Sequence, residues 1–216
     1  MNVPTLHTGG TTGADSAWIN CANLKKHHVK VYSFDGWKRT RIIDDEGNFE
    51  VIHLSMDEEE LDNLSLEKVS KDMKKTIPAT GYERNLLKRD CEMIKECDSL
   101  YAIGGFDKNS NSRLKVKGHT AWIVELYLNH LIAKNPNIHH EDCMLPIYFF
   151  NEDTEKETDG PENNKWYQLH HTKKENFRWI CKGNIFSNQI PKPNKNYIGV
   201  GSRELTELGK NALLTL

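Results

Sequence analysis

The sequence predicts an α/β fold: a Rossmann-like parallel sheet flanked by helices, with a small antiparallel appendage. Strand-like and helix-like periodicities alternate through most of the chain, which is the pattern of a parallel sheet covered on both faces. In three places a predicted strand runs through glycines into a predicted helix. We expect one domain over residues 1–216, about five parallel strands, and a loop or hairpin appended at residues 151–192.

The strands are predicted from short apolar runs and from alternation of apolar and polar side chains. They lie at residues 3–7, 29–34, 49–54, 99–103, 143–150, 166–170, 177–181 and 197–200. The third is a small extra strand that follows a polar, glycine-marked loop at residues 35–48. The sixth and seventh alternate aromatic with polar residues, as expected for an antiparallel pair.

The helices are predicted from apolar residues that recur every three or four positions, such as Trp18, Cys21 and Leu24 in the first. They lie at residues 14–26, 56–75, 82–96, 121–133 and 204–216. The second is charge-rich, acidic first and basic last, which suits the helix dipole and indicates a solvated face. Two polar stretches, residues 107–117 and 151–165, are expected to be loops.

Composition excludes several classes of protein. The 37% of hydrophobic and 28% of charged residues suit a soluble domain with a moderate core. The apolar segment 121–133 is interrupted by Glu125, Asn129 and His130, so it cannot span a bilayer. No signal peptide is visible, and five scattered cysteines indicate reduced thiols, so we expect a cytoplasmic, intracellular protein. The net charge of -2 provides no long-range field for a nucleic-acid backbone, which disfavours that partner.

The first glycine turn is the strongest candidate for binding a ligand. It reads His7-Thr8-Gly9-Gly10-Thr11-Thr12-Gly13-Ala14-Asp15. Glycines allow the backbone to approach a ligand closely, and the first N–H groups of the following helix attract an anion. The threonine hydroxyls add donors, while Asp15 is suited to a ribose hydroxyl or to fixing the loop. The alternative is a purely structural turn capped by Asp15.

The second candidate is the turn after the last predicted strand, Gly199-Val200-Gly201-Ser202-Arg203. Gly201 allows close approach, Ser202 can cap the helix, and Arg203 can pair with a phosphate in a bidentate manner. A helix cap without a ligand is the alternative. Because open α/β sheets bind ligands at the carboxyl ends of their strands, we expect both glycine turns to line one crevice.

Two further groups are weaker candidates. Gly104 ends a strand, and Gly118, His119 and Thr120 open the helix that contains Glu125. Gly118 and Thr120 could meet a second phosphate or a sugar. Glu125 is a candidate general base or ribose ligand, and a solvent-facing position is the alternative. Arg84 and Asn85 open another helix, where the dipole opposes an arginine and so hints at a bound anion; a surface salt bridge is the alternative. No zinc-type spacing of cysteine and histidine occurs, so we predict no metal and no cofactor.

The order of these motifs resembles a group of viral, phage and microbial proteins in the SLOG superfamily. The resemblance rests on the first turn through Trp18, then Arg84-Asn85, Tyr101-Ala102-Ile103-Gly104, Gly118-His119-Thr120-Ala121-Trp122, Trp166-Tyr167 and Gly199-Val200-Gly201-Ser202-Arg203. It implies a Rossmann-like fold and a nucleotide-type ligand on the glycine turns. For a viral protein, the location would be the host cytoplasm. A homodimer or other oligomer is a further expectation.

The sequence departs from that superfamily in two places. The group has Gly-Gly-Thr where this chain has Gly118-His119-Thr120, so an imidazole either replaces phosphate contact or adds a proton donor. The phosphoribohydrolases of the superfamily carry a catalytic glutamate three residues after the threonine, where this chain has Ile123. Glu125 lies two positions later, so that role does not carry over cleanly.

These observations leave two main hypotheses for function. The first is a sensor or sequestering protein that binds an ADP-ribose-like ligand or a nucleoside monophosphate. The alternative is an enzyme that hydrolyses the N-glycosidic bond of a nucleotide, with Asp15 and Glu125 as its carboxylates. A third, DNA binding of the kind found in the DprA branch of the superfamily, is disfavoured by the nearly neutral charge.

Overall fold

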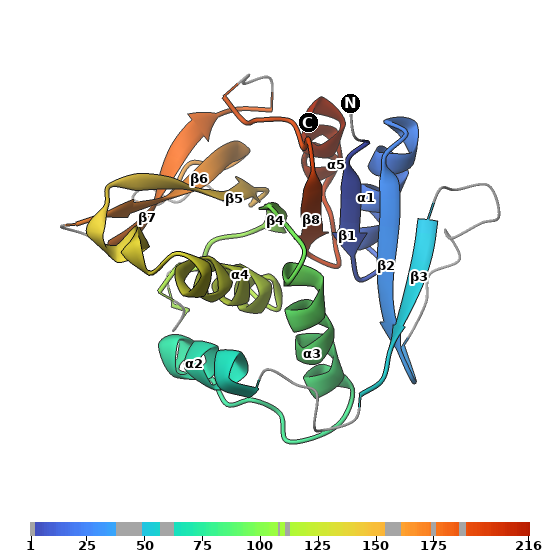
Figure 1. Cartoon of the computed structure of the whole chain (residues 1–216). Helices are drawn as coiled ribbons and strands as arrows, with labels where there is room; N and C mark the ends of the chain where they lie inside the picture. The colour runs from blue at the N-terminus through green and yellow to red at the C-terminus, as the bar shows by residue number, and fades with distance from the viewer. Residues whose placement is uncertain are drawn as a thin grey trace.

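The computed structural model describes residues 3–37, 49–56, 63–107, 109–110, 113–153, 161–173, 176–185 and 189–216. One eight-stranded sheet has the order β3-β2-β1-β8-β4-β5-β6-β7. Figure 1 shows this order from β3 at the right to β7 at the left. Its strands are β1 (Thr5–Thr8), β2 (His28–Phe34), β3 (Phe49–Leu54), β4 (Ser99–Gly104), β5 (Cys143–Asn151), β6 (Lys165–Thr172), β7 (Asn176–Gly183) and β8 (Asn196–Gly201).

The predicted fold class is confirmed. From β3 to β5, neighbouring strands of the sheet are parallel, while β6 and β7 add to it as antiparallel strands. The small extra strand expected at residues 49–54 is β3, and it belongs to the parallel part of the sheet. The antiparallel appendage lies within residues 151–192, as expected, although residues 154–160, 174–175 and 186–188 of it fall outside the described residues.

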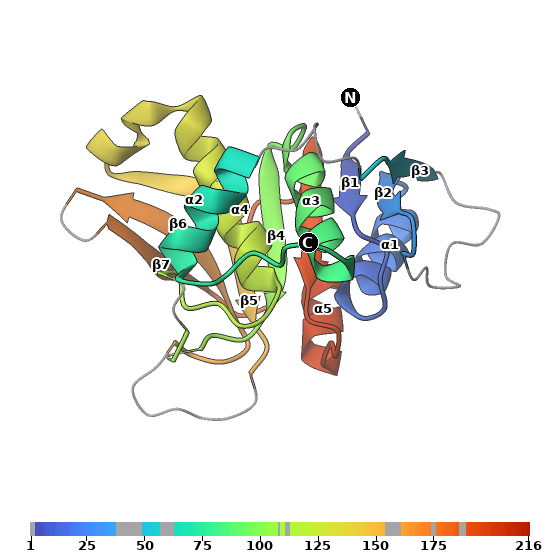
Figure 2. The ribbon, with the colours of Figure 1, turned by 90° about the horizontal axis from the view of Figure 1, so that it is seen from below.

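Helices cover both faces of the sheet. They are α1 (Ala14–Leu24), α2 (Asn63–Met73), α3 (Tyr82–Ile94), α4 (Thr120–Lys134) and α5 (Glu207–Thr215), with a short 3-10 helix η2 (Pro136–His140). One apolar core lies under α1 and α5, and the other under α2, α3 and α4. Figure 2 looks onto the face that α2, α3 and α4 cover. None of the described helices is long and apolar enough to cross a membrane.

The sequence explains why the central strands are buried on both sides. In β4, Leu100 and Ala102 pack into the core beneath α2, α3 and α4, while Tyr101 and Ile103 pack into the opposite core. Successive side chains of a strand point to opposite faces, so a strand covered twice reads as a continuous apolar run. α4 is buried along most of its length, including Glu125, which explains why its sequence lacks a polar face.

The sheet topology places a crevice at its carboxyl edge. The chain leaves β1 through α1 on one face and leaves β4 through α4 on the other. β8 lies between these two strands and is parallel to both. Where the connections from nearby strands go to opposite faces of a sheet, a crevice opens at the carboxyl ends of those strands. Open α/β sheets bind ligands in such a crevice. The first and last strands are neighbours, because β1 pairs with β8, and this pairing brings together the two glycine turns that were expected to line one crevice.

Candidate functional site

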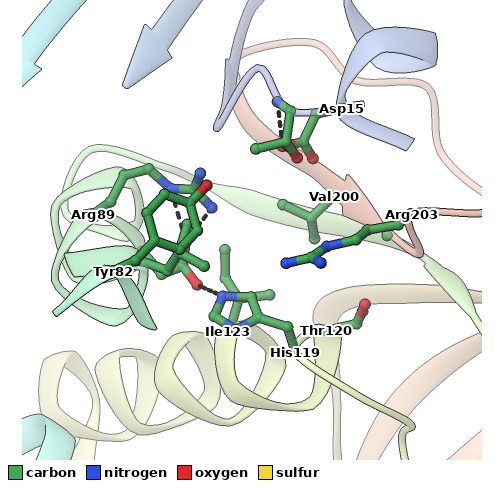
Figure 3. A pocket seen from close by; sticks show the side chains of 12 residues that line it. Asp15, Tyr82, Arg89, His119, Thr120, Ile123, Val200 and Arg203 are labelled. Atoms are coloured by element: carbon green, nitrogen blue, oxygen red, sulfur yellow. Dashed lines mark hydrogen bonds and ion pairs between the residues drawn. The ribbon is translucent and has the colours of Figure 1, made fainter. Parts of the chain in front are cut away.

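A small pocket lies in this crevice, with a volume of about 60 Å³. Its polar wall comes from the turn before α1, from α3, from the start of α4 and from the residues after β8 (Figure 3). The polar residues are Thr11, Asp15, Tyr82, Arg89, Asp90, His119, Thr120 and Arg203. Two wider hollows, of about 570 and 470 Å³, adjoin it at His119 and Arg203. The deep part therefore has room for a small chemical group, and the remainder of a ligand has room in the hollows.

The two glycine turns meet each other, as the sequence analysis expected. The backbone N–H of Ala14 donates to the carbonyl of Ser202 at 3.0 Å. Gly13 has a φ of 91°, and a Cβ there would lie 2.3 Å from the carbonyl oxygen of Arg203. Gly201 is also confined, because a Cβ would lie 2.4 Å from the carbonyl oxygen of Ile103. Contact between the two turns therefore accounts for these glycines, and a direct contact with ligand stays a prediction.

The other glycines of the first turn are packed against side chains. A Cβ on Gly9 would lie 2.2 Å from Nη1 of Arg89, and one on Gly10 would lie 2.5 Å from Cγ1 of Val31. Thr8 is completely buried at the end of β1, whereas Thr12 is exposed. A substitution at Gly10 would thus disturb packing as well as any ligand, which makes it a poor test of ligand binding.

Asp15 is buried at the start of α1 and points into the pocket (Figure 3). Its Oδ2 accepts hydrogen bonds from the backbone N–H of Thr11 at 3.1 Å and from the Thr11 hydroxyl at 2.9 Å. Burial raises the pKa of Asp15 above its ordinary value, although Arg89 and Thr11 act in the opposite direction. Asp15 therefore fixes the loop, which was one of the two roles expected for it. It also presents a carboxyl group to the cavity.

Arg89, Asp90 and His119 form a network on the opposite wall. Nε and Nη2 of Arg89 donate to Oδ1 of Asp90 at 3.2 and 2.9 Å, while Nε2 of His119 lies 2.7 Å from its Oδ2 (Figure 3). Burial opposes ionisation of Asp90, but Arg89 and His119 together hold its pKa below the ordinary value. Nη1 of Arg89 is buried and has no hydrogen-bond partner among the described residues.

Sequence reasoning missed Arg89 and Asp90 and chose Arg84 and Asn85, one turn earlier on α3. Arg84 donates to the carbonyl of Pro78 at 3.2 Å, and neither predicted residue lines the pocket. A signal for the missed pair was present. Arg89 and Asp90 fall on the helix stripe that begins at Leu86 and continues to the buried Met93, where apolar side chains are the rule.

Arg203 reaches into the pocket from the residues after β8, toward His119 (Figure 3). Its guanidinium makes no hydrogen bond or ion pair with any residue that the structure describes. Residues on both sides of Arg203 are held by Glu152, a buried residue that sequence reasoning also missed. Glu152 accepts from the Ser202 hydroxyl, and its Oε2 accepts from the Thr206 N–H at 2.9 Å and the Thr206 hydroxyl at 3.0 Å.

Glu125 is not at the pocket, which corrects the expectation that it faces either a ligand or solvent. It is completely buried, and its Oε2 accepts from Nε of Arg113 at 2.9 Å. Arg113 also lies 3.6 Å from Asp72 of α2. The other predicted residues around α4 lie at two different places. Gly104 and Gly118 line the hollow of about 570 Å³, whereas His119 and Thr120 line both that hollow and the small pocket.

The site thus gathers cations and carboxylates but no metal-binding cluster. In the described part of the chain, no group of three histidine, cysteine, aspartate or glutamate side chains could hold a metal ion. Comparison with models of protein families, with curated proteins and with solved structures found no match. The chemistry of the pocket itself is therefore the basis for assigning a function.

Proposed function

We propose that this protein binds a small phosphate-bearing ligand of the nucleotide type in the pocket, as a sensor or sequestering protein. One observation carries the proposal: Arg89, Arg203 and His119 converge on one cavity at the carboxyl edge of the sheet. Two guanidinium groups beside an imidazole favour an oxyanion, and guanidinium pairs well with phosphate. A nucleoside monophosphate and an ADP-ribose derivative both supply such a group.

The state of the two arginines supports this proposal. Arg203 lacks a partner among the described residues, and Nη1 of Arg89 is buried without one. A buried donor without a partner costs free energy, so an acceptor that enters the pocket has a hydrogen bond to gain. The resemblance to the SLOG superfamily points to the same class of ligand, because its motifs supply Thr120, Gly201 and Arg203 to this cavity.

The volumes support a ligand with one small anionic end. The deep pocket of about 60 Å³ accommodates a phosphate-sized group, and the adjoining hollow of about 570 Å³ has the size of a small-molecule site. His119, Thr120, Gly201 and Arg203 border both spaces. A nucleotide with its phosphate in the deep pocket would place its sugar and base in the open hollow.

Calorimetry with adenosine 5′-monophosphate and adenosine tests the proposal. We expect Arg203→Ala to weaken binding of the nucleotide by about 1.5–3 kcal/mol, because a hydrogen bond to a charged group is lost. Binding of the nucleoside should hardly change. Arg178→Ala is the matched control, because Arg178 is exposed on β7, outside the pocket. Equal nucleotide affinity in both variants and the wild type would contradict the phosphate assignment.

A second candidate function is hydrolysis of an N-glycosidic bond. The observation in its favour is that Asp15 presents a buried carboxyl of raised pKa to the cavity. In such a reaction the bond between C1′ and the base breaks, water adds to C1′, and the departing base takes up a proton. The partner role expected of Glu125 is dropped, because Glu125 lies outside the pocket.

Chromatography of the products separates the two candidates. If the protein is a hydrolase, Asp15→Asn should abolish release of the base while nucleotide binding persists. Glu125→Gln should leave release unchanged once its folding has been checked by circular dichroism. A wild-type protein that binds nucleoside monophosphates but releases no base from any of them has the binding function alone.

A further inference from the structure

Asp15 contributes an open acceptor to a cavity that is otherwise arranged for an anion. Both oxygens of Asp90 are engaged, Oδ1 by Arg89 and Oδ2 by His119. The two bonds that Asp15 accepts from Thr11 both go to Oδ2. Its Oδ1 has no hydrogen-bond partner among the described residues. Asp15 is only 6% exposed, so bulk water cannot easily screen its charge.

An ionised carboxylate and a fully ionised oxyanion repel each other in such a space, where the effective dielectric constant is low. A single proton between them reverses the interaction, because it turns the repulsion into a short, charge-assisted hydrogen bond. Phosphate monoesters have a second pKa near 6 and can bring this proton. Sulfate monoesters have the same shape but no such proton.

We propose that Asp15 selects an oxyanion that can share a proton with it, so that the pocket takes a phosphate monoester and rejects a sulfate monoester. The selection rests on the proposed function, since it assumes that the anionic group lies in this pocket. A proton shared with the ligand also explains how the carboxylate of Asp15 can lie in one anion site with Arg89 and Arg203.

Five other charged or titratable groups face the cavity. They are Arg89, Asp90 and Tyr82 from α3, His119 from the start of α4, and Arg203 after β8. Arg89 and Arg203 can only donate, and Asp90 is fully occupied.

The test compares adenosine 5′-monophosphate with adenosine 5′-sulfate by calorimetry at pH 7. We expect the wild type to prefer the phosphate by about tenfold or more, since like charges in close contact are strongly unfavourable. Asp15→Asn should bring the two affinities to within about threefold, mainly through a gain in sulfate binding, because an amide can donate to either anion. Asp98→Asn, which removes an exposed carboxylate directly before β4, should keep the wild-type preference.

The outcomes separate this inference from the proposed function. Equal affinity of the wild type for both esters, or a parallel loss of both in Asp15→Asn, would overturn the selection but leave the anion site in place. Failure of the wild type to bind either ester would overturn both. Should Asp15→Asn not fold, the pH dependence of sulfate binding is measured in the wild type and in His119→Gln. The sulfate affinity must fall with rising pH in both, because the variant lacks the imidazole and keeps Asp15 as a source of the proton. A sulfate affinity independent of pH would refute the role of Asp15.

Discussion

Asp90 of α3 and Glu125 of α4 are both buried carboxylates paired with an arginine, yet their surroundings differ. Asp90 shares its oxygens between Arg89 and His119, and all three residues border a cavity. Glu125 is bound by Arg113, whose guanidinium also lies near Asp72 and over the ring of Phe177. The comparison teaches that a buried ion pair does not by itself mark a functional site. A bordering cavity with donors left to satisfy is what distinguishes Asp90.

Among the substitutions considered, removal of Asp90 or Glu125 should lower the unfolding free energy most. The size of each loss ranks the two ion pairs by their contribution to stability. Asp90→Ala leaves the guanidinium of Arg89 buried without a counter-charge, which should cost about 3–5 kcal/mol of unfolding free energy. Glu125→Ala should cost less, about 1–3 kcal/mol, although the larger side chain is removed. The reason is that the side chain of Arg113 is 30% exposed and also lies near Asp72. Urea denaturation of both variants measures the order, and the reverse order would contradict this account.

His7 extends the comparison to a buried group that forms no ion pair with any of the described residues. It is completely buried in β1; its Nδ1 lies 2.9 Å from the Tyr32 hydroxyl, and its Nε2 has no partner among the described residues. Burial, with the Lys30 charge, lowers the pKa of His7 from 6.5 to about 4. Below pH 6.5 the unfolded chain therefore takes up a proton that the folded protein refuses. Stability should fall by about 3 kcal/mol between pH 6.5 and 4 for this reason.

Urea denaturation across that pH range measures the contribution of His7. His7→Leu should lose this part of the acid destabilisation, even though the lost hydrogen bond to Tyr32 lowers its stability at neutral pH. His28→Leu, at an exposed position in β2, is the control and should keep the wild-type dependence. If the two variants respond to acid alike, the burial of His7 does not govern the response.

Glu152 is another buried carboxylate, and its described partners are neutral. Thr206 donates to it twice and also caps α5, since its hydroxyl accepts from the Gly209 N–H at 3.0 Å. Thr206→Ala should lower the unfolding free energy by about 1 kcal/mol, as expected for a lost cap. Thermal denaturation measures the change, and Thr206→Ser should restore most of it. Equal stabilities of the alanine and serine variants would exclude the cap as the cause.

The exposed ion pair of Lys210 with Glu207 on α5 should contribute least to the unfolding free energy among the interactions compared. Its side chains are 50% and 81% exposed, so solvent screens the attraction. Lys210→Ala should change the unfolding free energy by no more than about 0.5 kcal/mol. A thermal shift comparable with that of Thr206→Ala would show that exposure does not rank these interactions.

Much of the fold could be predicted because its signals are local. Alternation of apolar and polar residues identified strands, and apolar residues every three or four positions identified helices. Glycines after the strands located the carboxyl edge of the sheet. The order of strands was predictable only in part: the pairing of β1 with β8 followed from the two glycine turns, but the place of β3 in the parallel sheet did not. Pairing between distant strands depends on contacts that no short segment encodes.

The candidate site divides in the same way. Asp15, His119, Thr120 and Arg203 were predicted because they adjoin glycine turns, and the structure brings them to one pocket. Arg89 and Glu152 were missed because they lie inside a helix and after a buried strand, where no turn marks them. Glu125 was misplaced because the direction of a side chain on a helix buried on nearly every side cannot be read from an apolar pattern.

The position of β8 has a consequence for the order in which the protein can assemble. β8 occupies the place between β1 and β4, although both of those strands precede it in the chain. During synthesis, β1 and β4 emerge with facing edges that lack a partner until residues 196–201 are added. The pocket cannot exist before that moment, because Arg203 and the backbone contact with Gly13 come later still. The proposed ligand therefore cannot assist the early steps of folding, and a nascent chain that stalls before β8 presents two open strand edges to other molecules.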